Sequence, residues 1–156
     1  SSQPQQKSEG QTATDAKSAE KTTKNIIKFK ELGVQITVPD TLKDIVYSTR
    51  DGELDGGKTF KMVDVSTSSL VALDSGCKPT GSAPPLGGLS KTTGTYPTNA
   101  DNINSSGSLI KQFKTYYIAY GSRQAYCSDT KSVQDKAETL RKAFEEAIKT
   151  VEEIPA

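Results

Sequence analysis

The first 24 residues of the chain contain no side chain that can build a core. The segment SSQPQQKSEGQTATDAKSAEKTTK has no Val, Ile, Leu, Met, Phe, Tyr or Trp. Such a stretch buries too little apolar surface to offset the entropy that ordering it would cost. We therefore expect residues 1–24 to be a disordered polar tether. Residues 25–156 then form a single globular domain, because about 130 residues suit one domain.

The start of the chain suggests a missing anchor. The first residue is Ser1 rather than an initiator methionine, so we expect a processed or truncated product. Its upstream part would be a signal peptide, a lipobox or a transmembrane anchor. The sequence itself holds no apolar run near the roughly 18–20 residues that span a bilayer. We expect an extracytoplasmic domain at the cell surface, attached to the membrane only through that missing segment.

The two cysteines, Cys77 and Cys127, predict a structural disulfide. A bridge would enclose nearly all of the irregular segment 74–108 and would contribute about 4 kcal/mol by the chain-entropy estimate. A redox-active pair usually has CxxC spacing, and two cysteines without histidine make a poor zinc site. Unpaired thiols are the remaining alternative. A disulfide would in turn indicate an oxidising compartment.

Composition excludes several classes of function. The chain has no histidine, which removes Ser–His–Asp and Cys–His mechanisms and histidine-ligated metals. Neither GxGxxG nor GxxxxGK[ST] occurs, so the common nucleotide-binding loops are missing. With 20 basic and 19 acidic residues, the chain lacks the basic bias of a nucleic-acid binder. We expect no cofactor and no enzymatic activity; an envelope enzyme using carboxylate or lysine chemistry is the less favoured alternative.

Alternating apolar residues predict an antiparallel sheet. Val34–Val38 alternates cleanly, and a tight turn separates it from Ile26–Lys30, so the two should form a hairpin. The stretch from Ser69 to Leu73 is either a strand or a short helix. Residues 74–108 are expected to be one long loop, either functional or poorly ordered. Three further strands are predicted, at Ile45–Thr49, Thr59–Val65 and Lys111–Tyr120.

The clearest predicted element is an amphipathic C-terminal helix. Its apolar positions are spaced 4, 3, 4, 3, 1 and 3 residues apart, which places them on one stripe. We expect a cap among residues 128–130 and a stop at Pro155. The expected fold is α+β: an antiparallel sheet of about 4–6 strands, the long C-terminal helix packed on one face, and one disulfide. The stripe comprises Val133, Ala137, Leu140, Phe144, Ala147, Ile148 and Val151.

A tyrosine cluster is the candidate surface for partner binding. Tyrosine offers a large contact area with a polar tip at little cost in rotamer entropy. The favoured alternative is that alternate tyrosines on a strand pack in the core or against the helix. The candidates are Tyr116, Tyr117, Tyr120 and Tyr126, with Tyr96 as a further member.

One segment resembles the opening of a calcium-binding EF-hand loop. Asp51, Glu53 and Asp55 stand at the first, third and fifth positions of such a loop, and Gly56 at the sixth. The twelfth position is Met62 instead of the bidentate glutamate, and the segment that follows is typical of a strand. A solvated hairpin loop is the favoured interpretation, and these three acids are a weak Ca²⁺ candidate.

Three strings in the sequence resemble a known group of proteins. They are FKELGVQITVPDTLKDIVYS, SLVALDSGC and TYYIAYGSRQAYCSD. Together they resemble uncharacterised, single-span extracytoplasmic proteins of ultrasmall, host-dependent bacteria, some with pilin-like N-terminal segments. The resemblance covers most of residues 28–150, implies an anchored surface protein with a disulfide, and transfers no functional residue.

The expected function follows from these features together. The tether, the bridge, the tyrosines and the long polar loop favour a non-catalytic surface binding or adhesion module on a flexible stalk. Its partner would be an unknown surface protein or glycan. The alternative is a structural subunit of a surface appendage, similar to a minor pilin.

Overall fold

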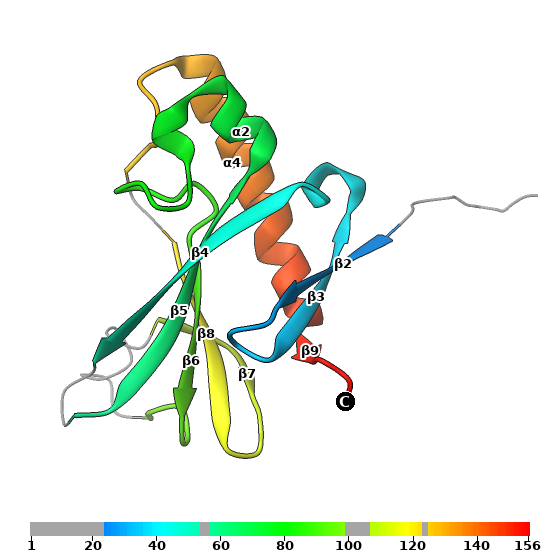
Figure 1. The fold of residues 1–156 in the computed structure, drawn as a ribbon, viewed down its shortest axis with the longest axis vertical. Helices are drawn as coiled ribbons and strands as arrows, with labels where there is room; N and C mark the ends of the chain where they lie inside the picture. The colour runs from blue at the N-terminus through cyan, green and yellow to red at the C-terminus, as the bar shows by residue number, and fades with distance from the viewer. Residues whose placement is uncertain (1–23, 54–56, 99–106, 123–124) are drawn as a thin grey trace, which may run out of the picture.

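The computed structural model describes residues 24–53, 57–98, 107–122 and 125–156. Two antiparallel sheets and a long C-terminal helix make up this part of the chain (Figure 1). The predicted α+β class is confirmed, with its antiparallel sheet, terminal helix and single disulfide. The predicted tether lies outside the described residues except for Lys24, which is the first residue of strand β2.

The smaller sheet is built on the predicted hairpin. Strands β2 (Lys24–Phe29) and β3 (Val34–Pro39) pair antiparallel, and β9 (Glu152–Glu153) adds to the other edge of β3. The turn between β2 and β3 needs a glycine, because Gly33 has a φ of 70°. The apolar alternation in β3 places Val34, Ile36 and Val38 in the core.

The larger sheet has five strands in the order β4-β5-β6-β8-β7. After a short 3₁₀ turn at Asp40–Leu42, the chain enters β4 (Ile45–Glu53) and returns in β5 (Thr59–Thr67). The remaining strands are β6 (Gly88–Thr93), β7 (Ser108–Gln112) and β8 (Tyr116–Gly121). Neighbouring strands pair antiparallel throughout.

Two expectations about these strands were wrong. The segment expected to be one long loop contains β6, which lies in the middle of the sheet between β5 and β8. The predicted strand Lys111–Tyr120 is instead a hairpin of β7 and β8, closed by a hydrogen bond from the Phe113 amide to the Tyr116 carbonyl at 2.8 Å.

The ambiguous stretch after β5 is a short helix, α2 (Ser68–Leu73). Its first turn is capped twice. Thr67 Oγ1 accepts a hydrogen bond from the Leu70 amide at 3.2 Å, and Asp44 Oδ2 accepts one from the Ser69 amide at 2.8 Å. A 3₁₀ turn at Ser75–Cys77 follows the helix.

The terminal helix α4 (Lys131–Ala147) carries five residues of the predicted stripe, Ile148 and Val151 follow it, and all seven stripe residues are buried. The helix ends well before Pro155, however. A 3₁₀ turn at Ile148–Thr150 follows it, and the chain then pairs with β3 as β9. The end is therefore set by strand pairing and not by the proline. Thr130 precedes the helix without a side-chain capping bond.

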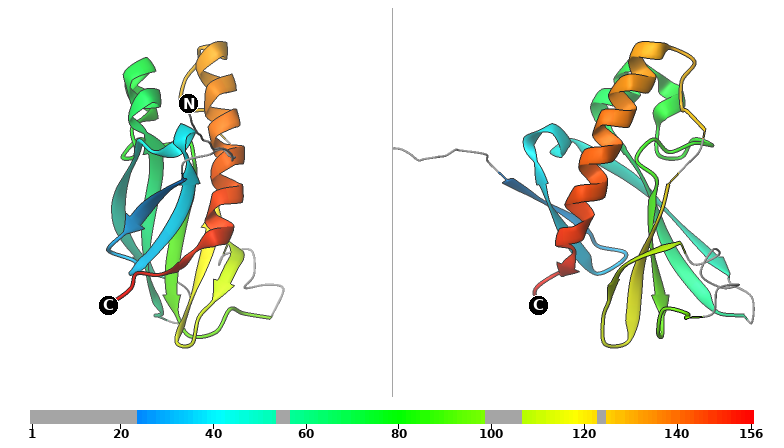
Figure 2. Two further views of the ribbon diagram at one scale, coloured as in Figure 1. Left: turned by 90° about the vertical axis from the view of Figure 1, so that its right-hand side faces the viewer. Right: turned by 180° about the vertical axis from the view of Figure 1, so that it is seen from behind.

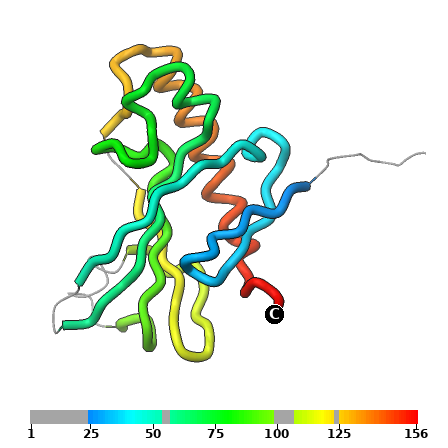
Figure 3. Tube along the Cα trace, in the orientation of Figure 1, coloured from blue at the N-terminus to red at the C-terminus, as the bar shows by residue number. Residues whose placement is uncertain are grey.

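One continuous core joins both sheets and the helix. Helix α4 lies along β3 of the smaller sheet, and its Phe144 ring lies 6.1 Å from the ring of Tyr120 on β8. Two further views show α4 running from the end of the molecule that carries α2 to the smaller sheet, with the strands of the larger sheet extending beyond it (Figure 2). At one end, α2 packs against α4, although the two helices are far apart in the sequence (Figure 3).

Candidate binding site

The predicted disulfide joins Cys77, at the end of the 3₁₀ turn after α2, to Cys127, shortly before α4. The S–S distance is 2.08 Å and the Cα atoms are 4.8 Å apart. Cys77 is completely buried, and its carbonyl accepts a hydrogen bond of 2.6 Å from the buried Ser66 hydroxyl on β5. The bridge therefore ties the segment before α4 to the larger sheet.

Asp74 adds a second tie beside the bridge. A hydrogen bond from the Ser128 hydroxyl and another from the Gly76 amide at 2.9 Å lower the pKa of the Asp74 carboxyl. The Ser128 oxygen also accepts a hydrogen bond of 3.1 Å from the Thr130 amide. The residues on both sides of the bridge are thus held by polar contacts as well as by the covalent bond.

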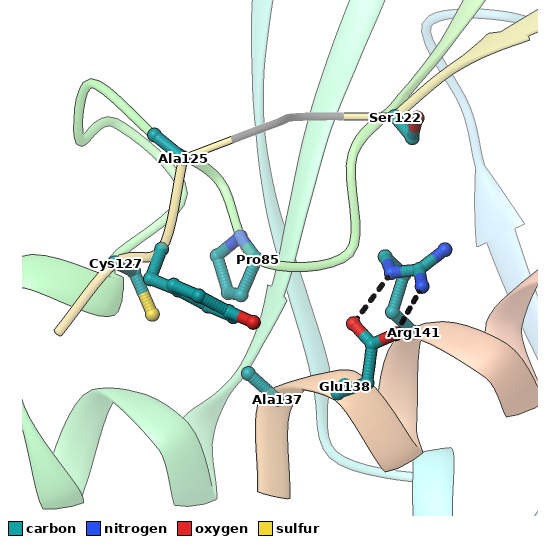
Figure 4. A pocket seen from close by; sticks show the side chains of 8 residues that line it. Pro85, Ser122, Ala125, Cys127, Ala137, Glu138 and Arg141 are labelled. Atoms are coloured by element: carbon teal, nitrogen blue, oxygen red, sulfur yellow. Dashed lines mark hydrogen bonds and ion pairs between the residues drawn. The ribbon is translucent and has the colours of Figure 1, made fainter. Parts of the chain in front are cut away.

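A pocket of about 250 Å³ opens next to Cys127. Its apolar walls come from the loop before β6 and from α4, and its polar wall is an ion pair on α4 (Figure 4). Tyr126 lines it as well, and this residue is 60 % exposed. The lining residues are Pro85, Ser122, Ala125, Tyr126, Cys127, Ala137, Glu138 and Arg141.

The ion pair on α4 is bidentate. Arg141 Nη2 and Nε donate to the two carboxylate oxygens of Glu138 at 2.6 and 3.2 Å, and Arg141 Nη1 also donates to Glu145. The hydrogen bonds from Arg141 lower the pKa of Glu138, and those same bonds raise the pKa of Arg141. The guanidinium is therefore a fixed wall of the pocket whose charge two carboxylates already balance.

Tyr120 connects this network to the loop before β6. Its hydroxyl lies 2.9 Å from the Leu86 carbonyl, to which it donates, and 3.4 Å from Glu145 Oε2. Burial, and then the nearby Glu145 charge, raise the pKa of this hydroxyl. By holding the Leu86 carbonyl, Tyr120 fixes the neighbouring Pro85 at the pocket wall.

The four candidate tyrosines do not share one surface. Tyr116, Tyr117 and Tyr120 are 8 %, 1 % and 8 % exposed, so all three are core side chains. Tyr116 donates to Glu153 Oε2 at 2.8 Å, and the ring of Tyr117 meets Tyr96 edge-on at 5.2 Å. Partner binding by these residues stays a prediction, and Tyr126 is the one of the four whose ring is open to a partner.

The calcium candidate is divided between described and undescribed residues. Asp51 lies on β4, where its carboxylate pairs with Lys61 on β5 at 2.9 Å, and Glu53 is the last residue of β4. Asp55 lies outside the described residues. Within the described ranges, no group of three or more Cys, Asp or Glu side chains could hold a metal ion.

Sequence reasoning missed most of the pocket wall. The charges of Glu138, Arg141 and Glu145 stand at i, i+3 and i+7 in the sequence, but this spacing is equally typical of a solvated helix face. Pro85 lay in the segment expected to be a loop, and nothing local places it beside α4. Only the tertiary fold brings these residues to Tyr126.

Comparison of the chain with protein-family models, with curated proteins and with solved structures gave no match. Among the described helices, none is both long and apolar enough to cross a membrane.

Proposed function

We propose that the chain is a non-catalytic binding module of the cell surface, which contacts a surface protein through the pocket beside the disulfide. The exposure of Tyr126 supports this proposal most directly, because this residue is 60 % exposed while Cys127, which follows it, is covalently fixed. An aromatic side chain on a braced backbone loses little freedom on binding, as contact residues that dominate an interface do.

The size and charge of the pocket favour one side chain of a partner protein as its occupant. A volume of about 250 Å³ falls below the roughly 300–1,000 Å³ typical of small-molecule sites. Pro85 and Ala137 offer apolar contact, and the Glu138–Arg141 pair carries no unbalanced positive charge for an anion. An apolar or aromatic side chain with a neutral polar group matches this lining.

The proposal that the chain is not catalytic rests on the pKa of Glu138, the carboxyl in the pocket wall. A carboxyl that acts as a general acid near neutral pH needs a raised pKa. The pKa of Glu138 is instead lowered by Arg141.

An extracytoplasmic location fits the disulfide, since such bonds persist mainly in oxidising compartments. Attachment at the cell surface by an anchor belongs to the same proposal.

The test is a binding measurement with three chains. Wild type, Tyr126→Ala and Leu109→Ala would be titrated by biolayer interferometry over an immobilised envelope-protein fraction of the source cells. Leu109 is the matched control, because it is an exposed apolar residue on β7 that does not line the pocket. We expect saturable binding by wild type, a loss of about tenfold or more for Tyr126→Ala, and no change for Leu109→Ala.

Two results would contradict the proposal. Equal affinities for all three chains would remove the pocket as the contact surface. The lack of any saturable wild-type binding would remove the binding function itself.

A further inference from the structure

A second and larger cleft lies at the end of β5 opposite to α2. It has a volume of about 470 Å³ and is formed by the β2–β3 turn and the adjacent faces of β4, β5 and β6. Among the residues that the structure describes, none lines both this cleft and the pocket beside the disulfide. The lining includes Glu31, Asp51, Thr59, Lys61, Lys91 and Thr93.

Two lysines stand side by side on the floor of this cleft. Lys61 on β5 and Lys91 on β6 are direct partners in the antiparallel register. They share a sheet face with the neighbouring pair Val63 and Leu89, which is fully buried in the core. Like charges directly opposite each other destabilise a sheet. Folding alone therefore does not favour this pair.

Only one of the two charges is balanced by a carboxylate. Lys61 Nζ lies 2.9 Å from Asp51 Oδ1. Lys91 Nζ lies 4.4 Å from the centre of the Tyr116 ring, and within the described part of the chain it makes no ion pair. The β2–β3 turn closes over it, since a Cβ on Gly33 would lie 3.9 Å from Lys91 Nζ. The Lys91 ammonium is thus half-buried between the Tyr116 ring and the β2–β3 turn, and it has N–H donors available for a ligand.

Apart from the apolar Phe60, the rest of the cleft lining suits hydroxyl groups. Thr59 and Thr93 are exposed and can donate and accept, and Glu31 is an acceptor on the turn. A hydrogen bond of 2.8 Å from the Tyr47 hydroxyl lowers the pKa of Glu31, which keeps this carboxylate ionised. Two lysines against two carboxylates leave the cleft with no net charge. A multiply charged phosphate would therefore meet repulsion from Glu31 and Asp51.

We propose that this cleft binds an acidic sugar, a monosaccharide unit with one carboxylate. The carboxylate pairs with Lys91, and the ring hydroxyls hydrogen-bond to Thr93 and Glu31. The cleft volume lies within the range of small-molecule sites. This site is independent of the partner contact at Tyr126, so either proposal can fail without the other.

The probes are three small molecules titrated into the ¹⁵N-labelled chain and followed by NMR. Methyl β-D-glucuronide carries the carboxylate, methyl β-D-glucoside is the neutral counterpart with the same ring, and inorganic phosphate is the anion without a sugar. We expect saturable shifts with the glucuronide, centred on the amides of Gly33, Lys91 and Thr93. The glucoside should bind about tenfold more weakly or worse, and phosphate should give no saturable shift at the same concentrations.

The matched variants are Lys91→Met and Lys111→Met. Lys111 makes the same kind of contact, with its Nζ 5.1 Å from the Phe113 ring centre, and it does not line the cleft. Lys91→Met should lower glucuronide affinity about tenfold or more, while Lys111→Met stays within about twofold of wild type. Met keeps the apolar stem of the lysine and removes the repulsion from Lys61. We therefore expect Lys91→Met to unfold at the same urea midpoint as wild type. If its midpoint is lower, Lys91→Gln is the second variant to be tested.

Three outcomes would overturn the proposal. Equal affinity for glucoside and glucuronide would remove the carboxylate from recognition. Equally tight phosphate binding would make the cleft a general anion site. Unchanged glucuronide binding by folded Lys91→Met or Lys91→Gln would place the ligand elsewhere.

Discussion

Gly76 and Cys127 approach each other so closely that a Cβ on Gly76 would lie 2.7 Å from the Cys127 carbonyl oxygen. The contact is between two backbones next to the disulfide, so no flexible side chain can move aside. Glycine is required at position 76 for space and not for an unusual φ, because this residue is not among the glycines of positive φ. The bridge and this close approach together determine where the segment carrying Tyr126 lies.

Gly76→Ala should therefore destabilise the protein. The added methyl group forces the two backbones apart at a site that the disulfide prevents from opening. We expect the free energy of unfolding to fall by about 1–3 kcal/mol, the usual cost of overpacking. Urea unfolding of the oxidised protein would measure it.

The control is Gly121→Ala in β8, where an added Cβ would meet no atom within 4 Å. This variant should leave the free energy of unfolding unchanged or raise it by about 0.4–1 kcal/mol, because alanine restricts the unfolded chain. If both substitutions lowered the free energy of unfolding equally, the close approach of position 76 to the Cys127 carbonyl would not be the cause of the loss.

Removal of the disulfide should have a larger effect. The bridge spans a sequence separation of 50 residues, for which the chain-entropy estimate is about 4 kcal/mol. We expect this loss in urea unfolding after reduction with dithiothreitol, and a similar one for the Cys77→Ala, Cys127→Ala double variant. Alkylation of the unreduced, denatured protein should modify no thiol, and its intact mass should be about two units below that of the reduced form. Two alkylated thiols in protein from its native envelope would contradict the bridge.

The sequence predicted best those elements in which one face is buried, because the spacing of their apolar residues then follows the helix or strand period. The stripe from Val133 to Val151 and the alternation of Val34, Ile36 and Val38 each bury every predicted residue. The burial of apolar side chains dominates in these segments, so local periodicity is enough to locate them.

Strand β6 could not be found in this way. Leu89 is its only large apolar residue, and its neighbours are Ser, Lys and Thr. It forms a strand because β5 and β8 supply partners on both sides, with Leu89 opposite Val63 and Tyr120. The β7–β8 hairpin was missed for a related reason, since its turn at residues 113–115 has no Gly, Pro, Asn or Asp.

The candidate sites depended on the fold in the same way. Tyr126 could be selected from the sequence only together with three tyrosines that are buried. The proximity of Pro85 to Arg141, and of Lys61 to Lys91, depends on how the strands pair, which no local pattern reports.

Asp44→Ala should weaken the start of α2. The Asp44 carboxylate accepts hydrogen bonds from the Ser69 amide at 2.8 Å and the Ser68 hydroxyl at 3.1 Å. Although burial acts to raise the pKa of Asp44, these bonds outweigh it and lower the pKa below the ordinary value of 3.8. We expect a loss of about 1 kcal/mol at neutral pH, the typical cost of removing a cap.

The pH dependence of this loss follows from the sign of the shift. Because the folded-state pKa is lowered, the stabilisation by Asp44 is present above pH 3.8 and disappears as the pH falls through the folded-state value. Wild type and Asp44→Ala should therefore differ in urea midpoint near neutral pH and converge in acid. A difference that persists undiminished at about pH 2 would contradict a role for the ionised carboxylate.

Alkaline solution should destabilise the protein through Tyr116 and Tyr120. Burial raises the pKa of both hydroxyls above the ordinary 10.0, followed by the hydrogen bond to Glu153 for Tyr116 and by the charge of Glu145 for Tyr120. Above pH 10 the unfolded chain therefore loses protons that the folded chain retains, so the free energy of unfolding falls as the pH rises. The Tyr116→Phe, Tyr120→Phe double variant should start from a lower stability near pH 8, by about 0.5–1.5 kcal/mol for each lost hydrogen bond, and should decline less steeply above pH 10. Urea midpoints of both chains between about pH 8 and about pH 11 would measure the two slopes, and equal slopes would assign the alkaline loss to other groups.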